Sequence, residues 1–258
     1  IIPHDNEYCR QILKGIRQFC LGERDLRLNL VETSIRFQPE TLVLDLDRYA
    51  GFIAHTDGLK AQRIEAKAVP VVQSSNRSPS PNLPAVLSDD FAVGRMGAEY
   101  LMGLGYRELV FLGGKKPEFS RLRGAGFSST ARNAGRHVTV LNDCKQADMR
   151  SVAAELLRKG QSVALMASSD LMARWFIESL PDPESDIPNR IVVLGVDDDP
   201  FENALSPIPL SSIRLAGERI GYEAARYALR LSSDPSPSRT FPHRLIPPLR
   251  VVEKRSTG

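Results

Sequence analysis

Cysteine, tryptophan and histidine are scarce in this sequence, and their scarcity excludes several classes of protein. The 258 residues include three cysteines, one tryptophan and four histidines. The cysteines at positions 9, 20 and 144 are odd in number and far apart, which argues against a disulfide framework and suits a reducing compartment. The histidines at positions 4, 55, 137 and 243 lack the spacing of metal ligands. We therefore expect a cytoplasmic protein without a metal site or a cofactor.

Long runs of apolar residues or of like charge are also missing. No apolar stretch approaches the roughly 20 residues of a membrane span, so no membrane partner is expected. Lys and Arg outnumber Asp and Glu by only 34 to 31. So small and dispersed an excess does not indicate a nucleic-acid-binding surface. The chain begins at Ile1-Ile2-Pro3 without a signal peptide, and we interpret it as an excised domain that starts inside its first strand.

Sequence signatures of common enzymes do not occur either. GxSxG, GxxxxGK[ST] and HExxH are missing, and no Cys/His pairing is suggested by spacing. Gly103 and Gly105 lack the later glycine of a dinucleotide fingerprint and follow a predicted helix. Without a nucleophile or a general base, we expect a binding protein with no catalytic residue.

The segment from Ala85 to Gly114 organises the rest of the chain. It reads as a strand, two carboxylates, an amphipathic helix that can end at Gly103 or Gly105, and the buried strand 108–112. Carboxylates at a strand end lie where open α/β sheets bind ligands. The paired glycines after 108–112 suggest a crossover or hinge.

Strand and helix patterns alternate along the whole chain. This alternation predicts an α/β fold with mostly parallel, doubly wound sheets. Because the pattern restarts after Gly114, we expect two Rossmann-like subdomains, 1–113 with 213–241 and 114–212 with 242–258, joined by hinges near 113–114, 211–213 and 247–248. Strands are expected at 26–31, 41–46, 51–54, 69–73, 138–141, 162–167, 191–196 and 210–214, and helices at 6–21, 57–66, 119–135, 148–159, 171–180 and 216–231.

Three predicted strand ends carry carboxylates, at Asp89, Asp170 and Asp197. Helix capping is the plain alternative, since an Asp before a helix satisfies free backbone amides. Three successive acids at 197–199 exceed what capping needs. Arg121 and Arg123 follow the Gly-Gly crossover, where the alternative is a solvated helix face. Carboxylates that accept and guanidinium groups that donate hydrogen bonds suit a small polyhydroxylated ligand.

Several segments resemble the LacI-type regulatory core, which has a periplasmic-binding-protein-like fold. VLSDDFAVGRMGAEYLMGLGYRELVFLGG is similar to the family's V-x-x-D-N-x-x-G stretch, with Asp90 where that pattern has Asn. The segments RLRGAGF, ALMASSDLMA, VVLGVDDDP and LSSIRLAGERIGYEAARYAL resemble further family segments, so the resemblance spans nearly the whole chain. It implies ligand-contacting positions for Arg123 and Asp197, and Ser169 stands where the family usually has Asn.

EYCRQILKGI and LIPPLRVVEKRSTG resemble the ends of the sensor in xylose-responsive regulators, in which an AraC-type helix-turn-helix domain follows a LacI-like sensor. This resemblance implies a homodimer, a pentose effector such as xylose held in an inter-lobe cleft, and DNA binding through a domain outside this chain. The competing interpretation is an extracytoplasmic sugar-binding protein of a transport system. The expected ligand-binding residues are Asn6, Tyr8, His55, Ser74, Asp89, Arg121, Arg123, Ser169, Asp170 and Asp197.

Overall fold

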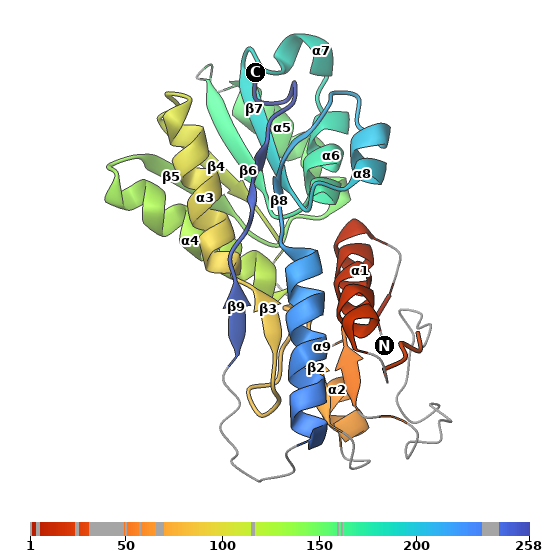
Figure 1. Ribbon diagram of the computed structural model, residues 1–258. Coiled ribbons are helices and arrows are strands. Elements are labelled where there is room, and N and C mark those ends of the chain that lie inside the picture. The colour runs from red at the N-terminus through yellow and green to blue at the C-terminus, as the bar shows by residue number, and fades with distance from the viewer. Residues whose placement is uncertain are drawn as a thin grey trace. The chain divides into compact units, whose positions relative to one another are not determined.

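The computed structural model forms two compact α/β units, between which the chain crosses three times (Figure 1). Unit 1 comprises Ile1–Ser88 and Ala216–Ile246, and unit 2 comprises Asp89–Leu215 and Pro247–Gly258. The expected α/β class with mostly parallel sheets is confirmed. The structure describes residues 2–3, 6–23, 26–30, 49, 51–56, 58–65, 70–114, 117–158, 160, 162–233 and 243–258.

Unit 2 contains a six-stranded sheet in the order β10-β8-β7-β6-β4-β5. All neighbouring strands are parallel except β10, which runs antiparallel to β8 at the edge. The central strands are almost continuously apolar, as expected for a parallel sheet that is covered on both faces. The strands are β4 (Glu108–Leu112), β5 (His137–Leu141), β6 (Val163–Ala167), β7 (Ile191–Val196), β8 (Ser211–Arg214) and β10 (Arg250–Val252).

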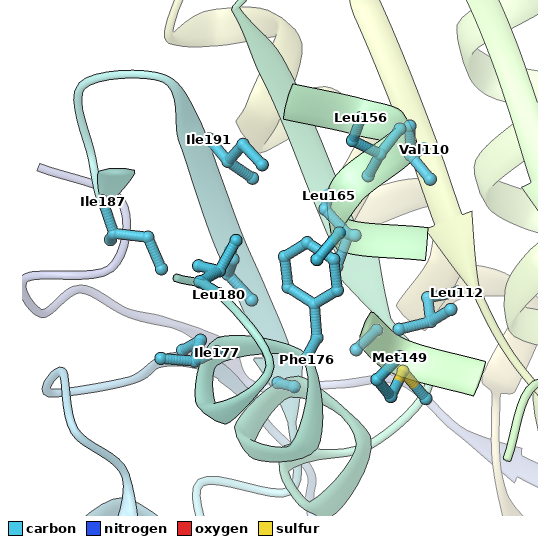
Figure 2. Close-up of a cluster of buried hydrophobic side chains, with 14 of the residues drawn as sticks. Val110, Leu112, Met149, Leu156, Leu165, Phe176, Ile177, Leu180, Ile187 and Ile191 are labelled. Carbon is cyan, nitrogen blue, oxygen red and sulfur yellow. The ribbon is translucent and has the colours of Figure 1, made fainter. Parts of the chain in front are cut away.

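Helices cover both faces of this sheet. Alternate residues of β4, β6 and β7 pack with α5 and α6 in one apolar core, and Figure 2 shows the Phe176 ring of α6 directed at Leu165 of β6. On the other face Phe111 of β4 packs against Phe127 of α4. The helical segments are α3 (Asp90–Gly103), α4 (Glu118–Asn133), the 3-10 turn Gln146–Asp148, α5 (Met149–Arg158), α6 (Asp170–Glu178), α7 (Pro183–Asp186) and α8 (Pro200–Leu205).

Glycines let α3 and α4 approach with backbones almost in contact. A Cβ on Gly94 of α3 would lie 1.9 Å from the carbonyl oxygen of Arg123 in α4. A Cβ on Gly126 of α4 would lie 2.1 Å from the carbonyl oxygen of Phe91 in α3. No side chain fits at those distances, so the helix spacing depends on glycine at both positions.

The described residues of unit 1 form four strands, which pair in parallel. β1 (Phe52–Ala54) pairs with β2 (Val71–Gln73), β3 (Val86–Ser88) pairs with β9 (Arg244–Ile246), and a single bridge from Gln73 to Ala85 links the pairs. The helices are α1 (Glu7–Gly22), α2 (Gly58–Glu65) and α9 (Gly217–Ser233).

The apolar faces of α1 and α9 meet in the core of unit 1. A Cβ on Gly15 would lie 1.8 Å from the Glu218 carbonyl oxygen, and one on Gly221 would lie 2.0 Å from that of Ile12. This helix pair therefore also depends on glycine at the contact.

Several expectations differ from the structure. The first crossing falls after Ser88 and not at 113–114, because β4 is an interior strand of unit 2, paired with β5 and β6. The second and third fall after Leu215 and Ile246 and not after 212 and 241. Ile2 and residues 26–30 are not in strands, whereas Val31 and the predicted strand 41–46 lie outside the described residues.

Two short helices were not expected. α7 lies between the expected helix 171–180 and the expected strand 191–196, and α8 follows the acids at 197–199. The helices of the described residues include none that is long and apolar enough to cross a membrane.

Candidate functional site

The strand order of unit 2 places a topological switch between β4 and β6. From β4 the sheet grows to β5 on one side and to β6, β7 and β8 on the other. In open α/β sheets, ligands bind outside the carboxyl ends of the strands at such a point. The residues there are Gly113–Gly114 after β4, Ser168–Asp170 after β6 and Asp197–Asp199 after β7.

Arg123 of α4 is the centre of a charged cluster at these strand ends. Its Nε donates to Asp90 Oδ1 at 2.8 Å, and its Nη1 donates to the Ser168 carbonyl oxygen at 2.6 Å. Nη1 also lies 3.9 Å from Asp197 Oδ1. The glycine contacts between α3 and α4 hold Arg123 against Asp90. One guanidinium thus joins the start of α3 with the segments after β6 and β7.

The segment Asp197–Asp199 has an unusual backbone. Asp197 has a φ of 114° and Asp198 a φ of 51°, which side-chain-bearing residues seldom adopt. Three hydrogen bonds from successive backbone N–H groups hold it: Asp197 donates to the Ile213 carbonyl at 3.0 Å, Asp198 to Ser212 Oγ at 2.9 Å, and Asp199 to Asp170 Oδ2 at 2.8 Å. Strained residues that their surroundings over-determine are concentrated at functional sites.

Asp170 holds this segment in place through a hydrogen bond from the Asp199 backbone. Its side chain is buried. Oδ1 accepts a hydrogen bond from the Ser212 hydroxyl at 2.6 Å, and Oδ2 accepts one from the Asp199 N–H at 2.8 Å. Glycine at position 195 leaves room for the carboxylate, because a Cβ there would lie 2.0 Å from Asp170 Oδ1. Burial raises the pKa of Asp170 well above its usual value, and the nearby Asp197 charge raises it further.

Asp197 is the carboxylate of the cluster that reaches the surface, with 27% of its side chain exposed, against 5% for Arg123. Burial raises the pKa of Asp197 to about 7; the Arg123 guanidinium lowers it, while the charges of Asp90, Asp199 and Glu202 raise it. Asp197 can therefore change protonation near neutral pH and accept a hydrogen bond from a ligand hydroxyl when ionised.

The neighbouring acids at 198 and 199 have structural partners. Asp198 accepts hydrogen bonds from Arg214 at 2.7 Å and from Lys254 at 3.2 Å. Asp199 caps α8 by accepting the Phe201 N–H at 2.9 Å. In the part of the chain that the structure describes, no group of three or more His, Cys, Asp or Glu side chains is placed to hold a metal ion.

The remaining predicted residues of unit 2 are placed differently. Asp89 caps α3 by accepting the Ala92 N–H at 2.9 Å, and Ser169 caps α6 by accepting the Met172 N–H at 3.3 Å. Asp89 thus has the capping role that was the alternative for the strand-end carboxylates, whereas α6 is capped by Ser169 and not by Asp170. Arg121 is not brought into the cluster: its side chain is 60% exposed and pairs with Glu118 of the same helix.

Four predicted residues belong to unit 1. Asn6 caps α1 by accepting the Cys9 N–H at 2.9 Å. The Tyr8 ring meets the His55 ring edge-on at 5.8 Å between centroids, and Ser74 Oγ lies 3.4 Å from His55 Nδ1. The structure thus brings Tyr8, His55 and Ser74 together at the start of α1 and the carboxyl ends of β1 and β2.

Sequence reasoning missed the importance of Asp90 and Ser212. The family resemblance marks Asp90 only as a replacement for Asn, and the predicted hinge at 211–213 includes Ser212. A buried arginine requires a carboxylate partner, and this requirement could have identified Asp90, because its neighbour Asp89 already accounts for the helix cap. Nothing in the local sequence indicates that Ser212 contacts both Asp170 and Asp198.

Known proteins resemble this chain over most of its length. The xylose operon regulatory protein of Escherichia coli (strain K12) is 31% identical over 94 residues, which is 36% of this chain and 23% of that protein. The regulator GntR of Pseudomonas aeruginosa is 28% identical over 228 residues, or 86% of this chain and 63% of that protein. The chain thus spans less than two thirds of either relative.

A solved structure of the xylose-binding transcription activator xylR shares the fold, with a TM-score of 0.80 and 21% identity over 100% of this chain and 68% of that one. A family model described as a periplasmic binding protein-like domain matches residues 98–257, which is more than half of the chain. Those residues contain α4, the ends of β6 and β7, and hence Arg123, Asp170 and Asp197. The chain belongs to the family of periplasmic binding protein-like domains.

Proposed function

We propose that this chain is the sugar-sensing, effector-binding domain of a bacterial transcription regulator. The carrying observation is the Arg123 cluster with the half-buried Asp197 carboxylate at the switch point of unit 2. Relatives named as regulators of a xylose operon, and a neighbour named as a xylose-binding activator, support the assignment to regulation. Proteins so named are regulators and not enzymes, in line with the chain's lack of enzyme signatures.

Asp197 is the group that we propose accepts hydrogen bonds from the sugar. A carboxylate accepts from two hydroxyl groups of a polyol, and such charge-assisted bonds are stronger than neutral ones. Arg123 holds the site together through Asp90 and the Ser168 carbonyl. We further propose that Tyr8, His55 and Ser74 contact the sugar, since they gather a ring, an imidazole and a hydroxyl at strand ends of unit 1.

The finer features of the proposal come from the resemblance to xylose-responsive regulators. They are a pentose effector such as xylose, a cytoplasmic homodimer and DNA binding through a domain outside this chain. The family name also suits one alternative function, that of a sugar-binding protein of a transport system. The three free cysteines, of which Cys9 is buried, favour a reducing compartment and hence the regulator.

Calorimetry with a panel of neutral sugars tests the proposal. D-xylose, L-arabinose, D-ribose, D-glucose and D-galactose are titrated into the chain, and we expect at least one to bind. Asp197→Asn keeps the shape of the side chain but removes its charge, so the affinity should fall about 10- to 100-fold, as for a lost hydrogen bond to a charged group. Arg123→Ala is less suitable because it would leave Asp90 buried without its cation.

Glu184→Gln is the matched control, because it also removes one negative charge and Glu184 pairs with Arg255 at an exposed position. We expect it to bind like the wild-type chain. Binding of none of the five sugars would contradict the proposed function. Unchanged affinity in Asp197→Asn would remove Asp197 from the site.

A further inference from the structure

Carboxylates outnumber cations around Asp197. Asp90 comes from α3, Asp170 from α6 and Asp199 from the same segment as Asp197. Arg123 of α4 is the cation that pairs with this group in the described part of the chain. Two other nearby acids are neutralised: Glu202 of α8 by Arg174 at 2.7 Å, and Asp198 by Arg214 and Lys254.

The exposed fractions decide which charge a ligand meets. The side chain of Arg123 is 5% exposed and that of Asp90 is fully buried, whereas 27% of Asp197 is exposed. Arg123 directs two of its donors, on Nε and Nη1, to Asp90 and the Ser168 carbonyl. An approaching ligand therefore meets a carboxylate, while the guanidinium lies behind it and is already balanced by a carboxylate of its own.

From this arrangement we propose that the site selects its ligand by charge: it accepts uncharged or ammonium-bearing sugars that donate to Asp197, and it rejects sugar acids. Asp90 is the residue that sets this preference, because it cancels the guanidinium that would otherwise attract an anion. The inference rests on the proposed function and adds the ligand class to it.

The preference depends on pH in a defined direction. Asp197, with a pKa of about 7, is mostly ionised at pH 8 and mostly protonated at pH 5.5. The charges that face it are those of Arg123, Asp90, Asp199 and, paired with Arg174, Glu202. The Asp170 carboxyl also lies there, and burial and the Asp197 charge raise its pKa well above its usual value. Selection against sugar acids should therefore be stronger at pH 8 than at pH 5.5.

Two series of sugars with a common ring configuration test the inference by calorimetry at pH 8. One consists of D-xylose, D-glucose, D-glucosamine and D-glucuronate, and the other of L-arabinose, D-galactose, D-galactosamine and D-galacturonate. In the series that binds, we expect the amine and the neutral sugars to bind at least about tenfold more tightly than the uronate. This factor corresponds to a difference of about 1.4 kcal/mol.

Asp90→Asn should reduce the ratio of the affinity for the neutral sugar to the affinity for the uronate about fivefold. A unit charge a few ångströms away contributes about that factor to an affinity even in water. Glu184→Gln makes the same change in net charge and should leave the ratio unaltered. A uronate that binds the wild-type chain as tightly as its neutral counterpart would overturn the inference while leaving sugar binding intact. If no member of either series binds, the proposed function falls as well. The wild-type comparison decides the matter even if Asp90→Asn does not fold.

Discussion

At the scale of single residues, burial separates the two charges that a ligand could meet. Arg123 and Asp90 form a nearly buried ion pair, whose removal on one side would leave an uncompensated charge. Asp197 keeps part of its surface in contact with solvent and stays 3.9 Å from the guanidinium. In the site that we propose, Arg123 therefore fixes positions and Asp197 binds the ligand.

Asp197 should also reduce stability at neutral pH. Its pKa of about 7 is higher than that of an unfolded Asp, so between about pH 4 and pH 7 the folded chain holds more protons than the unfolded chain. Stability from this group is therefore present at low pH and is lost as the pH rises towards 7. At pH 8 Asp197→Asn should therefore be more stable than the wild-type chain by on the order of 2 kcal/mol and should unfold at a higher temperature. At pH 4 the two chains should unfold at the same temperature.

Thermal unfolding at both pH values, without sugar, checks this expectation. Asn tolerates positive φ about as well as Asp, so the backbone of the strained segment is not changed. Glu184→Gln serves again as the control and should show no such pH dependence. A wild-type chain more stable than Asp197→Asn at pH 8 would show that Arg123 stabilises the Asp197 charge more than burial disfavours it.

Sequence reasoning reached Arg123 and Asp197 but not their surroundings. Asp197 was predicted from its position at a strand end and Arg123 from its position after the Gly-Gly pair, and the family resemblance supported both predictions. The pairing of Arg123 with Asp90 spans 33 positions in the sequence and depends on the approach of two helices. Likewise, the hydrogen bonds of Ser212 to Asp170 and Asp198 link different strand ends. Contacts of this kind follow from tertiary structure and leave no periodic signal in the sequence.

At the scale of elements, hydrophobic pattern was sufficient for long helices and buried strands. The expected strand 191–196 matches β7, and the expected helix 148–159 contains α5. Short elements were missed because four to six residues carry too little pattern, as in α7 and α8. The role of glycine at helix contacts was also missed: Gly94 and Gly126 lie within helices, where glycine is intrinsically unfavourable. Their positions become understandable only from the spacing of α3 and α4.

This spacing can be tested with Gly94→Ala. The new methyl group would collide with the Arg123 carbonyl oxygen, so α3 and α4 must separate and Arg123 must move from Asp90. We expect a loss of about 1–3 kcal/mol in unfolding free energy, as for other overpacked contacts, together with weaker sugar binding. Gly103→Ala in the same helix is the control, because nothing lies within 4 Å of its Cβ position. It should be neutral or slightly stabilising, and equal destabilisation in both variants, measured by urea unfolding, would contradict the close-packing argument.

At the scale of the whole molecule, the crossings between the units were the hardest feature to predict. Paired glycines after β4 suggested a hinge, yet β4 lies inside the sheet of unit 2. The observed crossing after Ser88 carries no glycine or proline in the sequence. Instead, a boundary depends on which strands pair, and β3 pairs with the distant β9 whereas β4 pairs with β5 and β6. Local composition does not contain this information.

The pairing of β8 with β10 leads to a prediction for unit 2 by itself. Arg214 and Arg250 are partners in this antiparallel pair, and the second part of unit 1 is inserted between them. Joining Leu215 directly to Pro247 would leave Leu215, Pro247, Pro248 and Leu249 as a four-residue hairpin loop, a common length for such connections. The chain 89–215 joined to 247–258 should therefore fold cooperatively, because its sheet and both helix layers lie within unit 2.

Circular dichroism and thermal unfolding of this shortened chain would check its folding, and carboxyl ¹³C chemical shifts would report the pKa of Asp197. We expect a single cooperative transition and a pKa still raised above the ordinary value, since every charged group that shifts it belongs to unit 2. Ser256→Ala provides an internal comparison: the Ser256 hydroxyl donates to the Val193 carbonyl at 2.6 Å and accepts the Ser211 N–H at 2.8 Å. Loss of this hydroxyl should lower the free energy of unfolding by about 1–3 kcal/mol, because the Val193 carbonyl and the Ser211 N–H lose their hydrogen-bond partner. A broad transition in the shortened chain, with an ordinary Asp197 pKa, would show that unit 2 needs unit 1 to form its charged cluster.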